Sequence, residues 1–109
     1  MTEFVKAISA ILPLYSFPAA EEARAPYATY TLSETPIRTK DGIAGYEGTI
    51  TLTIFATSIA AVDALMIRII QAIDSKILDD RKMYCADSEI SDYPEIGLTS
   101  KDLTINILR

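Results

Sequence analysis

The spacing of apolar residues changes abruptly at Thr57-Ser58, from every second residue to every third or fourth. Before this point apolar side chains share one parity and polar ones share the other, which predicts a strand with one buried face. The apolar set is Tyr46, Ile50, Leu52, Ile54 and Ala56, and the polar set is Glu47, Thr49, Thr51, Thr53 and Thr57. Phe55 is an apolar residue on the polar parity, so we expect it to contact a neighbouring element or a partner chain.

The residues after Ser58 repeat as one stripe of an amphipathic helix. The stripe comprises Ile59, Val62, Leu65, Met66, Ile69, Ile70 and Ile73, and the opposite face carries Asp63, Arg68, Gln71 and Asp74. Ser58 is the predicted N-cap, because its hydroxyl can accept a free amide of the first turn. A strand followed directly by such a helix predicts a helix packed on a sheet. Each fully buried large side chain would contribute roughly 1.5–3 kcal/mol.

The rest of the chain predicts one more helix and several strands. We expect a helix over residues 2–12, capped by Thr2 and ended by Pro13, because apolar residues recur there at helical spacing. Further strands are expected at residues 14–18, as a short edge strand, and at 26–33, 83–90 and 98–108. Residues 19–25 and 75–82 are expected to be polar connections, and 91–97 a turn.

Residues 34–45 are expected to form a long loop. Pro36 and the turn signal Lys40-Asp41-Gly42 support this prediction, and Arg38, Lys40 and Asp41 would project at its tip. The predicted order is helix, strand, strand, helix, strand, strand. That order favours an α+β fold in which two amphipathic helices pack on one face of a mostly antiparallel sheet. A length of 109 residues predicts a single domain over residues 1–109.

Composition argues against several classes of function. A net charge of −5 makes the chain a poor candidate for clamping nucleic acid phosphates. The absence of histidine removes the commonest general base and transition-metal ligand. No apolar run approaches the roughly 20 residues of a membrane span, and the N-terminus lacks signal-peptide features. With one cysteine there is no internal disulfide, which fits a reducing cytoplasm.

The remaining polar candidates give no catalytic or metal site. The acidic residues Asp79, Asp80, Asp87, Glu89, Asp92 and Glu95 do not match a calcium loop, so we interpret them as solvated. Cys85 has no histidine to activate it and is expected to be packed on a strand. We therefore predict no catalytic residue, no metal and no cofactor. The six tyrosines suit a core margin or an interface equally. Arg38 and Lys40 are either an anchoring pair or a solvated turn.

Three stretches together resemble a known family. They are Ala25-Pro26-Tyr27-Ala28-Thr29-Tyr30, the strand Glu47-Gly48-Thr49-Ile50-Thr51-Leu52-Thr53-Ile54-Phe55-Ala56, and the Thr57-Ser58 helix start. In this arrangement the chain resembles the small tail-completion, or tail-terminator, proteins of tailed bacteriophages and prophages.

This resemblance implies a structural protein without enzymatic activity. Such proteins form rings, typically hexameric, that cap the tail tube and join it to the head connector. They occupy the bacterial cytoplasm during assembly and then the virion tail. The expected contact with neighbouring subunits is made by the threonine face, Thr49, Thr51 and Thr53 with Phe55, or by the edge strands. Arg38, Lys40 and Asp41 would point to the lumen or an adjoining ring. An acidic lumen would let DNA slide without specific binding.

Two other classes of function remain open from the sequence. One is a small ligand-binding or regulatory α+β domain with an unknown partner. The other is an enzyme that uses carboxylates and tyrosines alone, which would need a cleft holding carboxylates of strongly shifted pKa.

Overall fold

Strand β3 (Gly42–Ala56) shows the alternation predicted from the sequence. Ile50, Leu52 and Ile54 are fully buried, whereas Thr51 is exposed. The computed structural model describes residues 2–16, 25–93 and 98–109, with the backbone alone at residues 16 and 87–93. Its other elements are α1 (Thr2–Ser9), β1 (Leu14–Ser16), β2 (Tyr27–Thr39), α2 (Ile59–Ile73), β4 (Ile77–Leu78), β5 (Arg81–Tyr93) and β6 (Leu98–Leu108).

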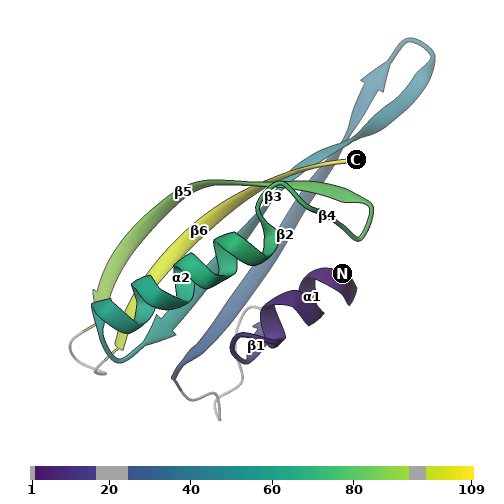
Figure 1. Cartoon of the computed structure of the whole chain (residues 1–109). Coiled ribbons are helices and arrows are strands. Elements are labelled where there is room, and N and C mark those ends of the chain that lie inside the picture. The colour runs from purple at the N-terminus through teal and green to yellow at the C-terminus, as the bar shows by residue number, and fades with distance from the viewer. Residues whose placement is uncertain (1, 17–24, 94–97) are drawn as a thin grey trace.

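The strands form one six-stranded sheet in the order β1-β2-β3-β6-β5-β4. The sheet curls, and α1 and α2 lie on its concave side (Figure 1). Only β1 and β2 pair in parallel among the described strands; the other neighbours are antiparallel. The α+β prediction with two helices is therefore confirmed. The short edge strand predicted at residues 14–18 is confirmed at Leu14–Ser16 as β1, whereas the edge strand β4 was not predicted.

Helix α2 begins where predicted. The Ser58 Oγ accepts a hydrogen bond from the Ala61 N–H at 3.1 Å, as an N-cap should. The buried residues are Val62, Met66, Ile69 and Ile73. The prediction that Ile59 is buried is wrong, because its side chain is 51% exposed. Ile59 is the first residue of α2, one turn before Val62, the first buried residue of the helix.

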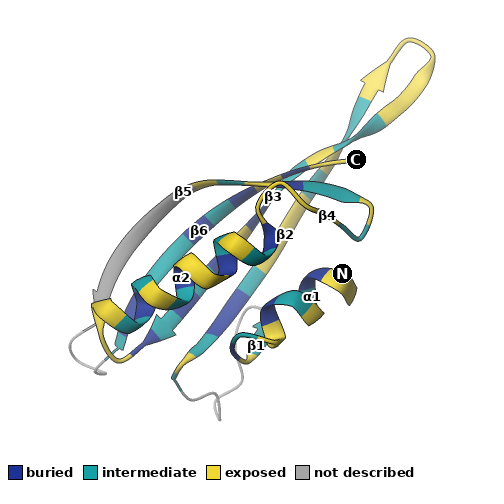
Figure 2. Cartoon of the chain, viewed as in Figure 1, coloured by how far each residue is buried: buried dark blue, intermediate teal, exposed yellow. Residues whose placement is uncertain are grey.

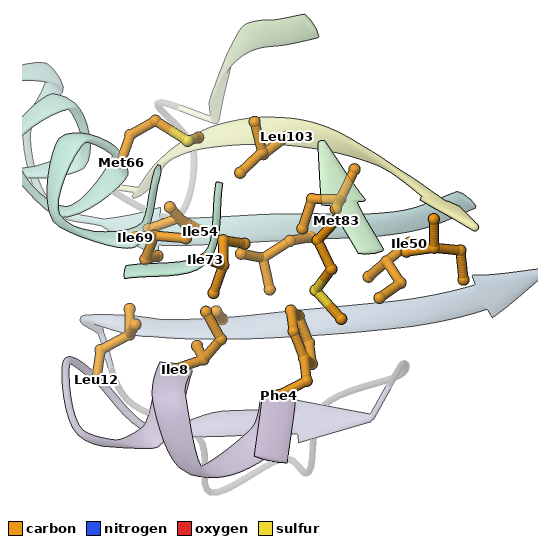
Figure 3. Close-up of a cluster of buried hydrophobic side chains, with 14 residues drawn as sticks. Phe4, Ile8, Leu12, Ile50, Ile54, Met66, Ile69, Ile73, Met83 and Leu103 are labelled. Carbon is orange, nitrogen blue, oxygen red and sulfur yellow. The ribbon is translucent and has the colours of Figure 1, made fainter. Parts of the chain in front are cut away.

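Side chains from both helices and four strands meet in one hydrophobic cluster (Figure 3). Phe4, Ile8 and Leu12 project from the α1 segment toward Ile73 and Met83. The ring of Phe4 also meets Tyr30 edge-on, with centroids 5.8 Å apart. This cluster lies entirely on the concave side, so the two helices cover a single face of the sheet, as the sequence predicted.

The N-terminus of α1 is capped from a distant part of the chain. The Asp79 carboxylate accepts hydrogen bonds from the backbone N–H groups of Glu3 and Phe4, both at 3.0 Å. The Glu3 carboxylate accepts the Asp79 N–H in return, at 3.1 Å. The prediction that Thr2 caps this helix is therefore wrong. The helix also ends earlier than predicted, at Ser9.

The predicted loop at residues 34–45 is the largest error of the sequence analysis. These residues continue β2 and β3 as a paired hairpin that turns at Lys40-Asp41. Pro36 is tolerated because alternate residues of a strand direct their N–H to opposite sides. The Ala28 N–H points toward β1, to the carbonyl of Pro13, so the nitrogen of Pro36 also faces the outer edge of β2.

Two further connections contain strand residues. Residues 75–82, predicted as a polar connection, include β4 and the start of β5. Strand β5 extends beyond the predicted 83–90 to Tyr93, and so takes part of the predicted turn at 91–97. The predicted connection at 19–25 and the rest of that turn fall mainly outside the described residues.

We expect Ile69→Ala to lower the free energy of unfolding by about 2–5 kcal/mol, because it leaves a cavity in the cluster. Urea denaturation followed by circular dichroism measures the change. The matched control is Ile67→Ala on the same helix, whose side chain is 56% exposed. It should change stability by less than about 0.5 kcal/mol. Equal losses for the two variants would contradict the assigned orientation of α2.

Candidate assembly interface

The convex face of the sheet carries rows of hydroxyl side chains. We call this the outer face; it is made by alternate residues of β2, β3 and β6. Three successive rows across these strands are Thr29–Thr53–Asp102, Thr31–Thr51–Thr104 and Ser33–Thr49–Asn106. Neither described helix covers this face (Figure 1). The Thr53 hydroxyl donates to Asp102 at 2.6 Å, which fixes one row.

Aromatic side chains gather at the end of the outer face farthest from the hairpin turn. Phe55 and Tyr27 are cross-strand neighbours, and their rings stack with centroids 4.8 Å apart. Tyr15 of β1 meets Tyr27 edge-on at 6.0 Å. The expectation that Phe55 contacts a neighbouring element is therefore confirmed. All three rings are half-buried, so they also remain accessible to a partner.

A shallow groove of about 450 Å³ crosses the other end of the outer face. Its side chains come from the rows Ser33–Thr49–Asn106 and Thr35–Glu47–Leu108. Gly48 contributes no side chain to it. A Cβ on Gly48 would lie 2.1 Å from the Ser33 carbonyl oxygen, so the close approach of β2 and β3 requires glycine there.

Beyond this groove β2 and β3 continue without β6 as a two-stranded arm, residues 36–45 (Figure 1). The tip residues Arg38, Lys40 and Asp41 are exposed, as Figure 2 shows for the whole tip. Gly42 has a φ of +119°, and the Thr39 hydroxyl donates to the Gly42 carbonyl at 3.1 Å. These features keep the turn tight, and a β-bulge between Ile37 and Arg38 shifts the register within the arm.

An ion cluster anchors the base of the arm on the concave side. The Glu34 carboxylate accepts two hydrogen bonds from Arg81, at 2.9 and 3.1 Å, and one from Arg109 at 3.3 Å. The Arg81 hydrogen bond lowers the pKa of Glu34 most, although burial opposes it; the charges of both arginines lower it further. Arg109 also lies over the Tyr46 ring, 4.5 Å from its centroid. The cluster therefore joins β2, β3, β5 and the end of β6.

The candidate residues from the sequence occupy two separate surfaces. Thr49, Thr51, Thr53 and Phe55 share the outer face, whereas the charged residues 38, 40 and 41 lie at the arm tip. Whether either surface contacts another subunit stays a prediction. Sequence reasoning missed the β2 half of the threonine rows, although Thr29, Thr31 and Ser33 alternate in the sequence. It also missed the Glu34 cluster, whose partners are 47 and 75 residues away.

Cys85 and the acidic residues are the candidates for a catalytic or metal site in the sequence. Burial raises the pKa of the Cys85 thiol to about 11, with a further contribution from Asp74, so it is a poor nucleophile. The side chain of Asp79 is used to cap α1. Asp80 is exposed, and residues 87–97, which include the remaining acidic candidates, have no described side chains. Elsewhere among the described residues, no three acidic or cysteine side chains are placed to hold a metal ion.

Helices long and apolar enough to cross a membrane are absent from the described part of the chain.

No family model matches the sequence, and no curated protein matches it. A solved structure does match the fold: a chain of the "Virion of native gene transfer agent (GTA) particle" superposes with a TM-score of 0.77. The two chains share one fold. The match covers 98% of this chain and 91% of the other, at 10% sequence identity.

We expect Glu34→Gln to lower the free energy of unfolding at pH 7 by about 1–2 kcal/mol, because it weakens the bonds to both arginines. The pKa of Glu34 is below its ordinary value of 4.5 in the folded state. Its stabilising contribution is therefore present above pH 4.5 and is lost as the pH falls through the folded-state pKa.

Urea titrations at neutral and acidic pH test this expectation. The difference between wild type and Glu34→Gln should shrink on acidification. Glu47→Gln is the control, since Glu47 is exposed and lies one row away on the opposite face. A difference for Glu34→Gln that does not change with pH would show that the ion cluster is not its cause.

Proposed function

We propose that this protein is a structural, non-enzymatic subunit of a phage-like particle that forms a ring at the junction of head and tail. The observation that carries the proposal is the shared fold with a chain of a gene transfer agent virion, over almost the full length of both chains. The small size, the acidic balance and the absence of histidine are consistent with it. A ring of six copies, bound to tail-tube and head-connector proteins, is the finer form of this proposal.

The outer face supports a role in assembly. A sheet face that carries threonines and half-buried aromatics can pack against protein without exposing a large apolar patch beforehand. We assign Thr49, Thr51, Thr53 and Phe55 to contacts with neighbouring subunits. Arg38, Lys40 and Asp41 at the arm tip would contact a neighbouring copy or an adjoining ring. The protein would occupy the bacterial cytoplasm before assembly and the virion tail afterwards.

Reconstitution with tail tubes encoded by the same genome tests the function. We expect the protein to co-sediment with polymerised tubes and to appear as a ring at their ends in electron micrographs. Tubes pre-incubated with a saturating amount of unlabelled protein should bind no labelled protein. The proposal would be overturned if the protein stays monomeric at high concentration and binds neither tail tubes nor head connectors. A tightly bound small molecule in the purified protein would favour the ligand-binding alternative.

We expect Thr51→Arg to abolish ring formation, because it places a charge in the centre of the outer face. The free energy of unfolding should change by less than about 0.5 kcal/mol, since Thr51 is exposed. Light scattering of the tube-bound fraction and urea denaturation measure the two effects. Gln71→Arg on the exposed side of α2 is the matched control and should still assemble. Normal assembly of Thr51→Arg would remove the outer face from the interface.

A further inference from the structure

The arm has the properties of a segment that is completed by a partner. From residue 36 to residue 45 its two strands pair only with each other, apart from the contacts at its base. Ile43 is 52% exposed near the tip. A two-stranded ribbon is only marginally stable in water by itself, so burying its apolar tip on another surface would stabilise it.

The tip is also positively charged on an acidic protein. Arg38 and Lys40 outnumber Asp41 there, whereas the whole chain carries a net charge of −5. Neither basic side chain takes part in an ion pair among those the structure describes. The tip therefore combines one exposed isoleucine with two unpaired cations.

The outer-face groove has complementary properties. Leu108, which is 48% exposed, lies in one row with the exposed Glu47 on the neighbouring strand. No described ion pair includes the Glu47 carboxylate. The small polar side chains of Ser33 and Thr49 line the groove beside them. The groove thus presents an apolar side chain and an anion to whatever enters it.

We propose that the arm tip of one copy binds in the outer-face groove of a second copy, with Ile43 against Leu108 and Lys40 or Arg38 against the Glu47 carboxylate. This proposal rests on the function proposed above and names the contact that would link its subunits. A tip cannot reach the groove of its own chain, because β2 and β3 remain paired from the groove to the turn. The contact must therefore form between copies.

Such a contact joins two different surfaces, so every copy would offer one tip and one groove. A contact of this head-to-tail kind generates a closed ring when the rotation between copies closes, and a filament when it does not. Nucleic acid is the alternative binding partner for a basic tip. Asp41 at the turn and Glu47 at the base make phosphate the less suitable partner.

Mixed disulfide formation between two different chains tests the contact. Ile43→Cys in one chain and Leu108→Cys in another are combined, each in a Cys85→Ser background, so that a 43–108 disulfide can form only between copies. The control pairs Ile43→Cys with Ile67→Cys, since Ile67 is 56% exposed, slightly more than Leu108 at 48%, but lies on α2. Under mild oxidation, we expect the 43–108 dimer to form at least about fivefold faster than the control dimer.

Charge reversal then tests the ionic part. Glu47→Lys in the Leu108→Cys chain should slow the 43–108 dimer about fivefold, as the loss of an exposed ion pair worth about 1 kcal/mol predicts. Arg38→Glu with Lys40→Glu in the partner chain should restore the rate. Both changes affect exposed residues, and circular dichroism verifies that each variant is folded.

The outcomes separate this contact from the proposed function. If the 43–108 pair forms no faster than the control while rings still cap the tubes, the contact is wrong and the proposed function stands. A chain that neither cross-links nor assembles overturns both. A third outcome is that the 43–108 pair does not form and that Arg38→Glu with Lys40→Glu abolishes binding of double-stranded DNA. In that case the tip binds nucleic acid, and the contact between copies is wrong.

Discussion

Burial of one face of β3 beneath α2 is the interaction on which the rest of this structure depends. Ile50, Leu52 and Ile54 are fully enclosed on that face, and Ile69 and Ile73 close it from above. Because successive strand residues point to opposite sides, this burial also fixes the direction of the threonines. A shift of β3 by one residue would expose the isoleucines and bury the hydroxyls. The polar outer face is thus a consequence of the core and needs no separate explanation.

Sequence reasoning was accurate where the determining signal is local. The alternation in β3, the cap at Ser58 and the stripe of α2 are each read within a few residues of one another, and each is confirmed apart from Ile59 in the stripe. It failed where the signal lies elsewhere in the chain. Asp79 caps a helix some 75 residues away, and no local sequence pattern predicts this contact. Proline and glycine in residues 34–45 indicated a loop, but Pro36 faces an open strand edge where no hydrogen bond is lost.

For the candidate interface too, sequence reasoning predicted the local features and missed those that depend on distant residues. The parity of β3 predicted the shared face of Thr49, Thr51, Thr53 and Phe55 correctly, because period-two alternation leaves no other arrangement. The groove depends on the register between β2, β3 and β6, which the sequence alone does not specify. The anchor of the arm depends on three charged residues brought together from strands distant in sequence. Two arginines converge on a single carboxylate there, and no short-range pattern in the sequence indicates that they meet.

Pro36 has one further consequence, for the behaviour of the free subunit. Among the described residues, the outer edge of β2 pairs with β1 over three residues, and no described strand pairs with this edge toward the arm. Open edges invite the addition of foreign strands and the growth of fibrils, and a proline interrupts that addition by removing a donor. With this edge blocked, the protein can reach high concentration without adding strands through its backbone, so that any association depends on its side chains.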